Sequence, residues 1–278
     1  SGVNGSGKTT LMKVLAGIIS SDSGERAIQK DTRISYLPQS GIVHKGKTLF
    51  SEADSAFQYG YDLQAEYEAI GEVLSKNPSK NEALLNRHQE IHEKLENMLW
   101  HRREAAIEQI LLGLGFERND FQRKVEEFSG GWQMRIALAK VLLEGSDIIL
   151  LDEPTNYLDL EARNWLENFL QSFTGGFLLV SHDRYFLDST VNEVYEIFSG
   201  NLKRYAGNYS QYEKLREVEL EGLLARYAQQ QEEIKKLEDF IRRFGAKATK
   251  AAQAQERQKM LDKMEIIKIP ENLKKIHF

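Results

Sequence analysis

The strongest constraint on the fold of this chain lies at its start, where Gly2–Thr9 follows the pattern G-x-x-x-x-G-K-[ST] in full. Glycines at these positions let backbone N–H groups curl around a phosphate, and the helix that follows points its N-terminus at the anion. We expect the Lys8 ammonium to reach the β- and γ-phosphates of a nucleotide and the Thr9 hydroxyl to bind Mg²⁺. The residues expected to contact the phosphates are Asn4, Gly5, Ser6, Gly7, Lys8, Thr9 and Thr10.

The composition narrows the class of protein further. The 278 residues include no cysteine, which excludes disulfides, thiolate zinc sites and cysteine nucleophiles and suits a reducing compartment. Hydrophobic residues make up 41% of the chain and charged residues 28%, so a packed core is expected. Apolar runs are short, as at Ile148–Leu151, whereas a membrane-spanning helix needs roughly 20 such residues. We therefore expect a cytoplasmic protein without a membrane domain.

Hydrophobic periodicity predicts an α/β domain with a helical insertion. A helix from Lys8 to about Ile19 follows the glycine loop, and residues 51–128 are largely helical, with an acidic first part. Buried parallel strands are expected at Ile148–Leu151 and Phe177–Val180, with a helix over roughly 160–172 between them.

Two carboxylates end the first of these strands. We expect Asp152 to hold Mg²⁺ and Glu153 to orient or deprotonate a water that attacks the nucleotide. His182 ends the next strand and can bind the γ-phosphate and the water, although a histidine at a strand end is more often a plain polar residue. Gln39 follows Tyr36-Leu37-Pro38, and by itself it would be an ordinary loop glutamine.

Together these residues resemble the motifs of the ATP-binding cassette (ABC) family. The matching segments are, in chain order, Gly2–Thr9 (Walker A loop), Gln39 (Q-loop), Ser129–Gln133 (signature), Ile148–Glu153 (Walker B with its catalytic glutamate), Asn156–Asp159 (D-loop) and His182 (switch histidine). The resemblance narrows to the ABC-F subfamily. Its first cassettes carry blocks similar to Ser129–Trp132, Leu151–Asp159, Ser181–Leu187 and Gly207–Tyr212.

The resemblance implies a fold and an activity. It implies a P-loop NTPase α/β cassette with an α-helical subdomain at about 51–128, and Mg²⁺-dependent ATP hydrolysis that drives closure of two cassettes. It also implies that Gln39 acts at the catalytic site beside Mg²⁺. Ser129, Gly130 and Gly131 would contact the ATP that is bound to the partner cassette. The ABC-F resemblance implies a soluble translation factor on the ribosome, whose linker reaches tRNA or ribosomal RNA.

The same resemblance suggests how the chain is organised. We expect residues 1–210 to form the cassette, 211–268 a helical hairpin linker, and 269–278 the approach to a second cassette. The family's strands before the Walker A loop and its second cassette are missing from this sequence, so we expect a fragment of a two-cassette protein. Such a fragment should be a weak or inactive ATPase by itself. Tyr157 stands where the family usually has histidine, a change that we expect to be tolerated.

The predicted linker has its own pattern. A β-hairpin is expected around Ser199-Gly200-Asn201, and apolar residues then step by three and four through residues 220–244, with Gln230 as the one polar position. This pattern predicts a first helix of about 34 residues, broken at Gly245. A second helix from about Lys247 to Lys268 should pack against it as an antiparallel hairpin.

The charge distribution points to a polyanionic partner for the linker. The formal net charge of the chain is −5, yet residues 241–278 carry ten basic and four acidic side chains. A local excess of positive charge can meet nucleic-acid phosphates, although a solvated helical surface is the plainer interpretation. The cations expected to contact nucleic acid are Arg242, Arg243, Lys247 and Lys250.

Other interpretations stay open at this point. The chain could be the ATPase subunit of an ABC transporter, an ABC-F protein that acts on branched DNA, or a scaffold that binds ATP without turnover. Glu153 argues against the scaffold. His88, His92 and His101 invite a metal site, but ordinary packing is the favoured interpretation because no cysteine or ordered carboxylate accompanies them.

Overall fold

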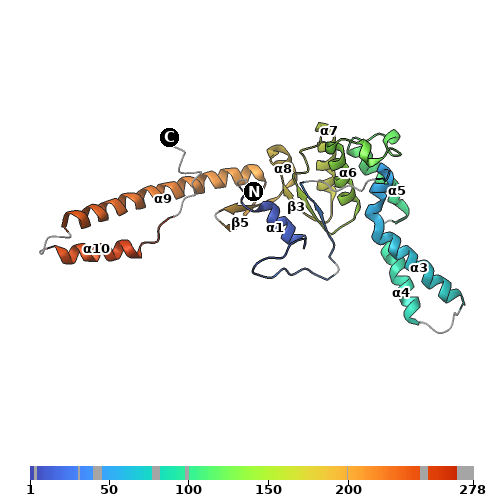
Figure 1. The fold of residues 1–278 in the computed structure, drawn as a ribbon, viewed down its shortest axis with the longest axis horizontal. Coiled ribbons are helices and arrows are strands. Elements are labelled where there is room, and N and C mark those ends of the chain that lie inside the picture. Colours follow the sequence, from blue (N-terminus) through green and yellow to red (C-terminus); the bar gives the residue numbers. More distant parts are fainter. Residues whose placement is uncertain are drawn as a thin grey trace. The chain divides into compact units, whose positions relative to one another are not determined.

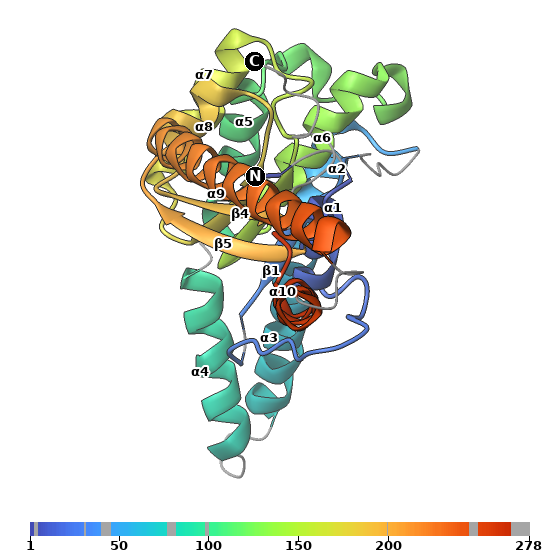
Figure 2. The same ribbon diagram turned by 90° about the vertical axis from the view of Figure 1, so that its left-hand side faces the viewer.

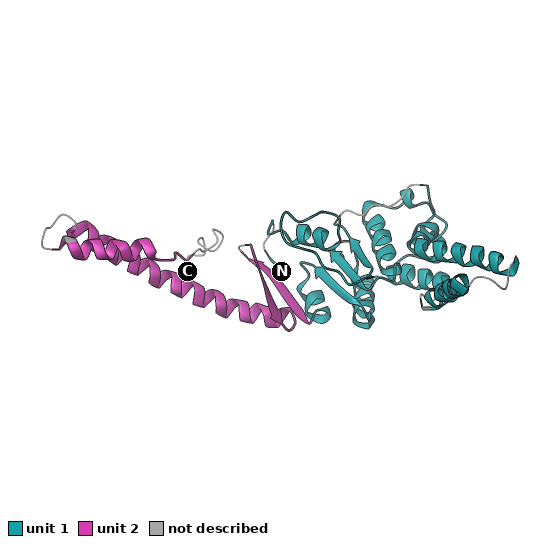
Figure 3. Ribbon diagram, turned by 90° about the horizontal axis from the view of Figure 1, so that it is seen from below, with its two compact units in different colours: residues 1–191 teal, residues 192–278 magenta. Residues whose placement is uncertain are grey.

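The computed structural model describes residues 1–2, 5–30, 32–39, 46–76, 82–97, 100–198, 200–244 and 250–267. The chain forms two compact units, residues 1–191 and 192–278 (Figure 3). The division of the sequence into a cassette at 1–210 and a linker at 211–268 stays a prediction.

A three-stranded parallel sheet organises the first unit. Its order is β1 (Ile34–Leu37), β2 (Ile148–Asp152), β3 (Gly176–Val180). The apolar run of β2 lies in the middle and is almost wholly buried, as a central parallel strand should be. Asp152 lies opposite Val180 in the register, so the carboxyl ends of β2 and β3 meet at the same edge of the sheet.

The long segment between β1 and β2 is helical. Its α-helices are α2 (Leu49–Asp54), α3 (Gln58–Lys76), α4 (Glu82–Asn97), α5 (Arg103–Gly113) and α6 (Gly130–Leu143). α6 packs against β1 and against α2 and α5, and nine of its residues are buried. α3 and α4 pack side by side as an antiparallel pair that reaches away from the sheet (Figure 2).

Two histidines of α4 pack against one tyrosine of α3. The His88 ring stacks on the Tyr67 ring with 3.9 Å between centroids, and His92 lies against the same ring at 6.0 Å. His101 follows α4 and is exposed, with Nε2 3.0 Å from Glu96 Oε1. Within the described residues, no three histidine or acidic side chains are grouped as a metal site would require.

The first helix is shorter than the sequence pattern predicted. α1 spans Lys8–Leu15 and ends four residues before Ile19. Gly17 adopts a φ of +76°, and the Ile18 N–H donates to the Lys13 carbonyl oxygen at 2.9 Å. A glycine in the left-handed region next to such a bond is a common helix stop, so the apolar pair that follows α1 lies in a turn.

Two further α-helices of the first unit each follow a strand of the sheet. α7 (Leu160–Ser172) connects β2 to β3, as predicted for roughly 160–172, and α8 (Arg184–Thr190) follows β3. Figure 1 shows α8 beside β3. The predicted α/β cassette fold is confirmed by this sheet and its helices.

The second unit consists of a β-hairpin and a helical hairpin. β4 (Glu193–Phe198) pairs with β5 (Asn201–Ala206) in an antiparallel ladder. α9 (Tyr209–Phe244) has 36 residues, and α10 (Ala251–Lys263) packs back against it. Residues at the predicted seam of α9 are half-buried, whereas most of their neighbours on the helix are exposed.

The second linker helix ends earlier than predicted, at Lys263 instead of Lys268. The polar seam residue explains the difference. The Gln230 side chain donates to the Glu265 carbonyl oxygen and accepts from the Ile267 N–H, both at 2.8 Å. These bonds give an extended segment the backbone partners that further helical turns would supply. The predicted start of this helix at Lys247 lies outside the described residues.

Among the described residues, no helix combines the length and the apolar character needed to cross a membrane.

Candidate nucleotide site

A cavity of about 420 Å³ lies where the glycine loop meets the carboxyl ends of the strands. Its volume falls within the range of small-molecule sites. The loop, β2 and β3 place their polar residues here because parallel strands end at one edge of a sheet. The lining residues are Gly5, Gly7, Lys8, Thr9, Thr10, Gln39, Asp152, Glu153, Asn156, Val180 and His182.

Most residues that the sequence singled out for nucleotide and Mg²⁺ therefore line one cavity. Asn4 lies outside the described residues, and Ser6 is not among the lining residues. Ser129, Gly130 and Gly131 begin α6 and do not line this cavity. Their expected contact with a partner's ATP stays a prediction.

The glycine loop has the backbone that its sequence requires. Gly5 and Gly7 adopt φ values of +79° and +96°, a region that residues with a Cβ rarely occupy. Gly7 precedes α1 directly, and its carbonyl oxygen accepts from the Leu11 N–H at 2.8 Å. The Ser6 hydroxyl is buried and has no hydrogen-bond partner among the described residues. A buried hydroxyl without a partner in this loop suits a phosphate oxygen as its acceptor.

Two oxygen ligands suited to Mg²⁺ are already in contact. The Thr9 hydroxyl donates to Asp152 Oδ2 at 2.7 Å, and Asp152 is only 2% exposed. Gln39 contributes an exposed amide at the same cavity. Mg²⁺ prefers carboxylate, hydroxyl and phosphate oxygens, so the donors on the protein fit this ion.

Glu153 has an unusual backbone. Its φ is +55°, and it is the one non-glycine residue with a positive φ in the part of the chain that the structure describes. Its N–H donates to the Val180 carbonyl oxygen at 2.8 Å. Strain of this kind persists only where neighbours hold it, and it is found often at functional sites. The tight turn aims the carboxylate at the end of β3.

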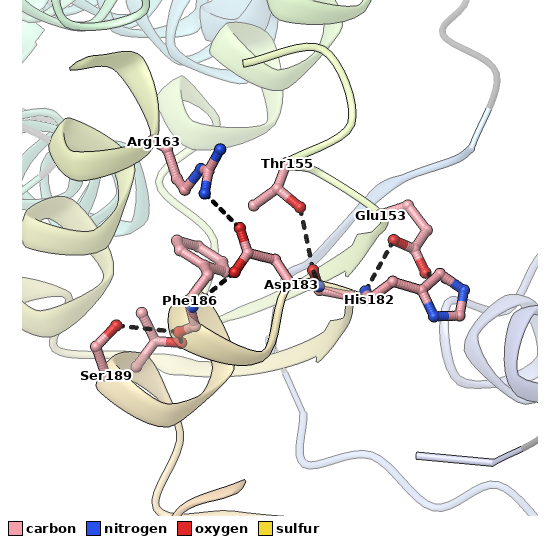
Figure 4. Close-up of polar contacts among 9 residues, drawn as sticks. Glu153, Thr155, Arg163, His182, Asp183, Phe186 and Ser189 are labelled. Carbon is pink, nitrogen blue, oxygen red and sulfur yellow. Dashed lines mark hydrogen bonds and ion pairs between the residues drawn. The ribbon is translucent and has the colours of Figure 1, made fainter. Parts of the chain in front are cut away.

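The Glu153 carboxylate meets His182 there (Figure 4). Oε2 accepts from the His182 backbone N–H at 3.2 Å, and Oε1 lies 3.3 Å from the ring nitrogen Nε2. Burial raises the pKa of the Glu153 carboxyl above its ordinary value, and the nearby His182 acts in the opposite direction. The His182 side chain is 69% exposed, so it can meet a ligand in the cavity.

The sequence did not predict a hydrogen-bond network that lies next to His182. Thr155 and Ser181 share a hydroxyl hydrogen bond of 3.1 Å, and the Asp183 N–H donates to the Ser181 hydroxyl at 3.0 Å. One Asp183 oxygen caps α8 by accepting from the Phe186 N–H, and the other lies 2.7 Å from Arg163 Nη1 (Figure 4). Of these contacts, only the cap of α8 is indicated by the local sequence, because an aspartate directly before a helix is a common N-cap.

The basic residues of the linker are partly engaged with neighbours. Arg242 Nη2 donates to Asp239 Oδ1 at 2.6 Å, and Lys250 Nζ lies 4.5 Å from the centre of the Phe244 ring. Arg243 is exposed, and Lys247 lies outside the described residues. Their contact with nucleic acid stays a prediction.

The sheet, the helical insertion and this cavity define an ATP-binding cassette of the ABC type. Comparisons with known proteins agree: family models described as ABC transporter match residues 1–156 and 195–278. The structure of an ATP-binding subunit of an ABC transporter has a TM-score of 0.54 to this chain at 17% identity. The match covers 74% of this chain and 76% of that subunit, and it shows the fold. The chain belongs to the ABC transporter family of ATP-binding proteins.

Its relatives in sequence include ABC-F proteins. An uncharacterised ABC transporter ATP-binding protein of Bacillus subtilis, YfmM, is 37% identical over 96% of this chain and 52% of its own length. ABC transporter F family member 5 of Arabidopsis thaliana is 34% identical over 97% of this chain and 40% of its own length. The predicted ABC-F relationship is thereby confirmed. The chain spans about half or less of the length of these relatives.

Proposed function

We propose that this chain is the cassette and linker of an ABC-F ATPase, which binds ATP with Mg²⁺ and hydrolyses it when a second cassette closes on it. One observation carries the proposal. The glycine loop, the Thr9–Asp152 pair and the Glu153–His182 pair converge on a single cavity. Phosphate binding, a metal site and a base for water are the parts that phosphoryl transfer to water requires.

In this proposal the loop holds the phosphates. The N–H groups around Gly5 and Gly7 and the ammonium of Lys8 bind them, and the Ser6 hydroxyl gains its acceptor. Thr9, Asp152 and Gln39 hold Mg²⁺ directly or through water, which would neutralise charge on the phosphate oxygens. The Thr9–Asp152 contact means that two of these groups need little rearrangement.

Glu153 acts as the base for the attacking water, and His182 positions the water and the γ-phosphate. A carboxylate with a raised pKa is a stronger base than an ordinary glutamate, and the strained turn fixes its direction. His182 Nε2 lies beside Glu153 Oε1, so both groups can contact one water.

The second cassette completes the reaction. Ser129, Gly130 and Gly131 lie outside this cavity, which suits a role at the ATP of the partner cassette, and by symmetry the partner's signature would cover the ATP at Lys8. The present chain alone should therefore turn over ATP slowly.

Glu153→Gln tests the proposal in the protein that includes both cassettes. The amide keeps the shape of the side chain but cannot take a proton, so phosphate release should fall by about 10²–10⁴-fold while ATP binding persists. Glu161→Gln, at an exposed position of α7, is the matched control and should behave like the parent protein. A steady-state rate for Glu153→Gln within twofold of the parent would refute the assignment.

We further propose a cytoplasmic, ribosome-associated role in translation, with the linker in contact with tRNA or ribosomal RNA. The ABC-F relatives and the positive charge of residues 241–278 support it. The cations assigned to this interaction are Arg242, Arg243, Lys247 and Lys250.

A charge-removal variant tests this partner. Replacing the four cations by glutamine should leave ATP binding intact and weaken cosedimentation with ribosomes. The slope of log affinity against log salt should become shallower by about 0.7–0.9 for each phosphate that the variant no longer neutralises. Lys235 and Lys236, exposed on α9, provide the control replacement. Tighter binding to DNA junctions than to ribosomes would favour the branched-DNA alternative, and copurification with membranes the transporter alternative.

A further inference from the structure

A buried arginine outside the nucleotide cavity makes polar contacts through all three of its guanidinium nitrogens. Arg135 lies on α6, four residues after Gly131, and is only 8% exposed. A guanidinium is almost never buried unless its donors are matched by acceptors. The partners of Arg135 therefore show what it is placed to hold.

Those partners come from two other segments, the end of α5 at Leu114 and the turn that holds Tyr157 and Asp159. Nε donates to the Tyr157 carbonyl oxygen at 2.7 Å, Nη1 donates to the Leu114 carbonyl oxygen at 2.9 Å, and Nη2 lies 2.8 Å from Asp159 Oδ2. The guanidinium carbon also lies 4.3 Å from the centre of the Trp132 ring. A planar fork of donors can satisfy such a set at once, whereas an ammonium cannot reach all of it.

Gly115 makes room for this arrangement. A Cβ added to Gly115 would stand 2.9 Å from Arg135 Nη1, closer than real side chains allow. A Cβ added to Gly131 would meet the Tyr157 side chain at 3.5 Å, an ordinary contact distance. The start of α6 therefore lies near the Tyr157 turn.

The segment that Arg135 holds also forms a wall of the cavity. In the turn at residues 153–159, Glu153 and Asn156 line the cavity, and Tyr157 and Asp159 bind the guanidinium. Asp159 Oδ1 in addition accepts from the Ala162 N–H at 2.9 Å and so caps α7. One end of the turn thus lines the nucleotide cavity, and the other is tied to the helix that begins directly after Ser129.

We propose that Arg135 is a positioning residue for ATP hydrolysis, which fixes the turn at 153–159 against the start of α6. Glu153 and the Ser129–Gly131 segment then keep one relative placement, so the cavity of this cassette and the surface offered to the partner's ATP are set together. The inference rests on the proposed ATPase function.

Arg135→Lys in the two-cassette protein tests it. Lysine keeps the positive charge but lacks the several N–H donors of the guanidinium, so the turn at 153–159 should shift. A displacement near 1 Å can lower a catalytic rate by about 100-fold, so we expect kcat to fall by about 10–100-fold. Affinity for ATP, measured with a fluorescent analogue, should stay within twofold of the parent. Amide hydrogen exchange at residues 155–160 should rise. Arg118→Lys, at a side chain that is 76% exposed, is the control and should change none of these three readouts.

A second variant tests the link to the turn. Asp159→Asn keeps an oxygen to cap α7 and removes the charge that Arg135 faces. It should lower kcat less than Arg135→Lys does, and combining the two should add little, because both act on one interaction.

The outcomes separate the two proposals. A folded Arg135→Lys protein with kcat within twofold of the parent, or with unchanged exchange at 155–160, would overturn the role of Arg135. So would a fall in kcat matched by weaker ATP affinity or by a smaller folded fraction. If Glu153→Gln hydrolyses ATP like the parent, the proposed function fails, and the exchange measurement still decides whether Arg135 holds the turn.

Discussion

Removing Arg216 should release the linker helix from the β-hairpin of the second unit. Arg216 on α9 is largely buried, and its Nε donates to Glu196 Oε1 at 2.6 Å. Glu196 on β4 is 6% exposed, so it depends on this partner. The Tyr205 hydroxyl donates its one proton to Glu219 Oε2 at 2.8 Å and lies 3.3 Å from Glu196 Oε2. The Arg216 guanidinium lies 4.3 Å from the centre of the Phe198 ring.

The magnitude follows from these interactions. Breaking a buried ion pair by removing one partner typically costs about 3–5 kcal/mol, because the other charge stays buried. When Arg216 is absent, the Tyr205 proton can turn from Glu219 to Glu196, which places Arg216→Met near the lower end, at about 3 kcal/mol. Methionine fills most of the vacated volume, so little of this cost should come from a cavity.

Urea denaturation monitored by circular dichroism provides the assay. A matched second variant, Glu196→Gln, removes the stranded charge, so the double variant should recover more than half of the loss. A loss below about 1 kcal/mol for Arg216→Met would place the pair in the class of exposed ion pairs and refute the reasoning. No recovery in the double variant would show that the packing of Arg216 on Phe198 dominates.

Three further predictions concern the site and the linker. Because the pKa of Glu153 is raised, ATP turnover should fall as the pH drops through a value above 4.5, and an acidic limb at or below 4.5 would contradict a buried base. The stability of the fold should depend on pH in the opposite direction. The raised pKa means that the folded state favours the protonated Glu153, so the stability gained from this proton is lost as the pH rises through the pKa of the folded state. Glu153→Gln should therefore be more stable than the parent at pH 8 but not at pH 4. Gln230→Ala should remove the hydrogen bonds to the backbone of Glu265 and Ile267 and so raise amide hydrogen exchange there. The loss of two bonds should lower the free energy of unfolding by about 1–2 kcal/mol. Gln229→Ala, at an exposed position, is the control and should have neither effect.

The sequence alone determined most of the cavity. The glycine loop, the carboxylates after β2 and the histidine after β3 were identified from spacing, because each depends on local backbone rules. Glycines select the positive φ values of the loop, and a continuous apolar run marks a buried strand whose end must reach the sheet edge. The linker hairpin was likewise predictable, since its half-buried seam repeats every three and four residues.

Local patterns were less reliable where helices stop. The apolar period continued past α1, but Gly17 ended the helix at Leu15. The second linker helix ended at Lys263 because Gln230, more than thirty residues away, offers its backbone another set of hydrogen bonds. A periodic pattern records which face is buried, and it says little about which backbone group finds a partner.

Only the tertiary structure decided the interactions that hold the site in place. The positive φ of Glu153, the Arg163–Asp183 pair behind His182 and the Arg135 fork left no pattern that could be recognised in the sequence. Arg135 bonds carbonyl oxygens 21 and 22 residues away, and a carbonyl is present at every residue, so residue type does not reveal the pairing. Such interactions depend on how α5, α6 and the turn after β2 pack together, and that packing is fixed by the whole core.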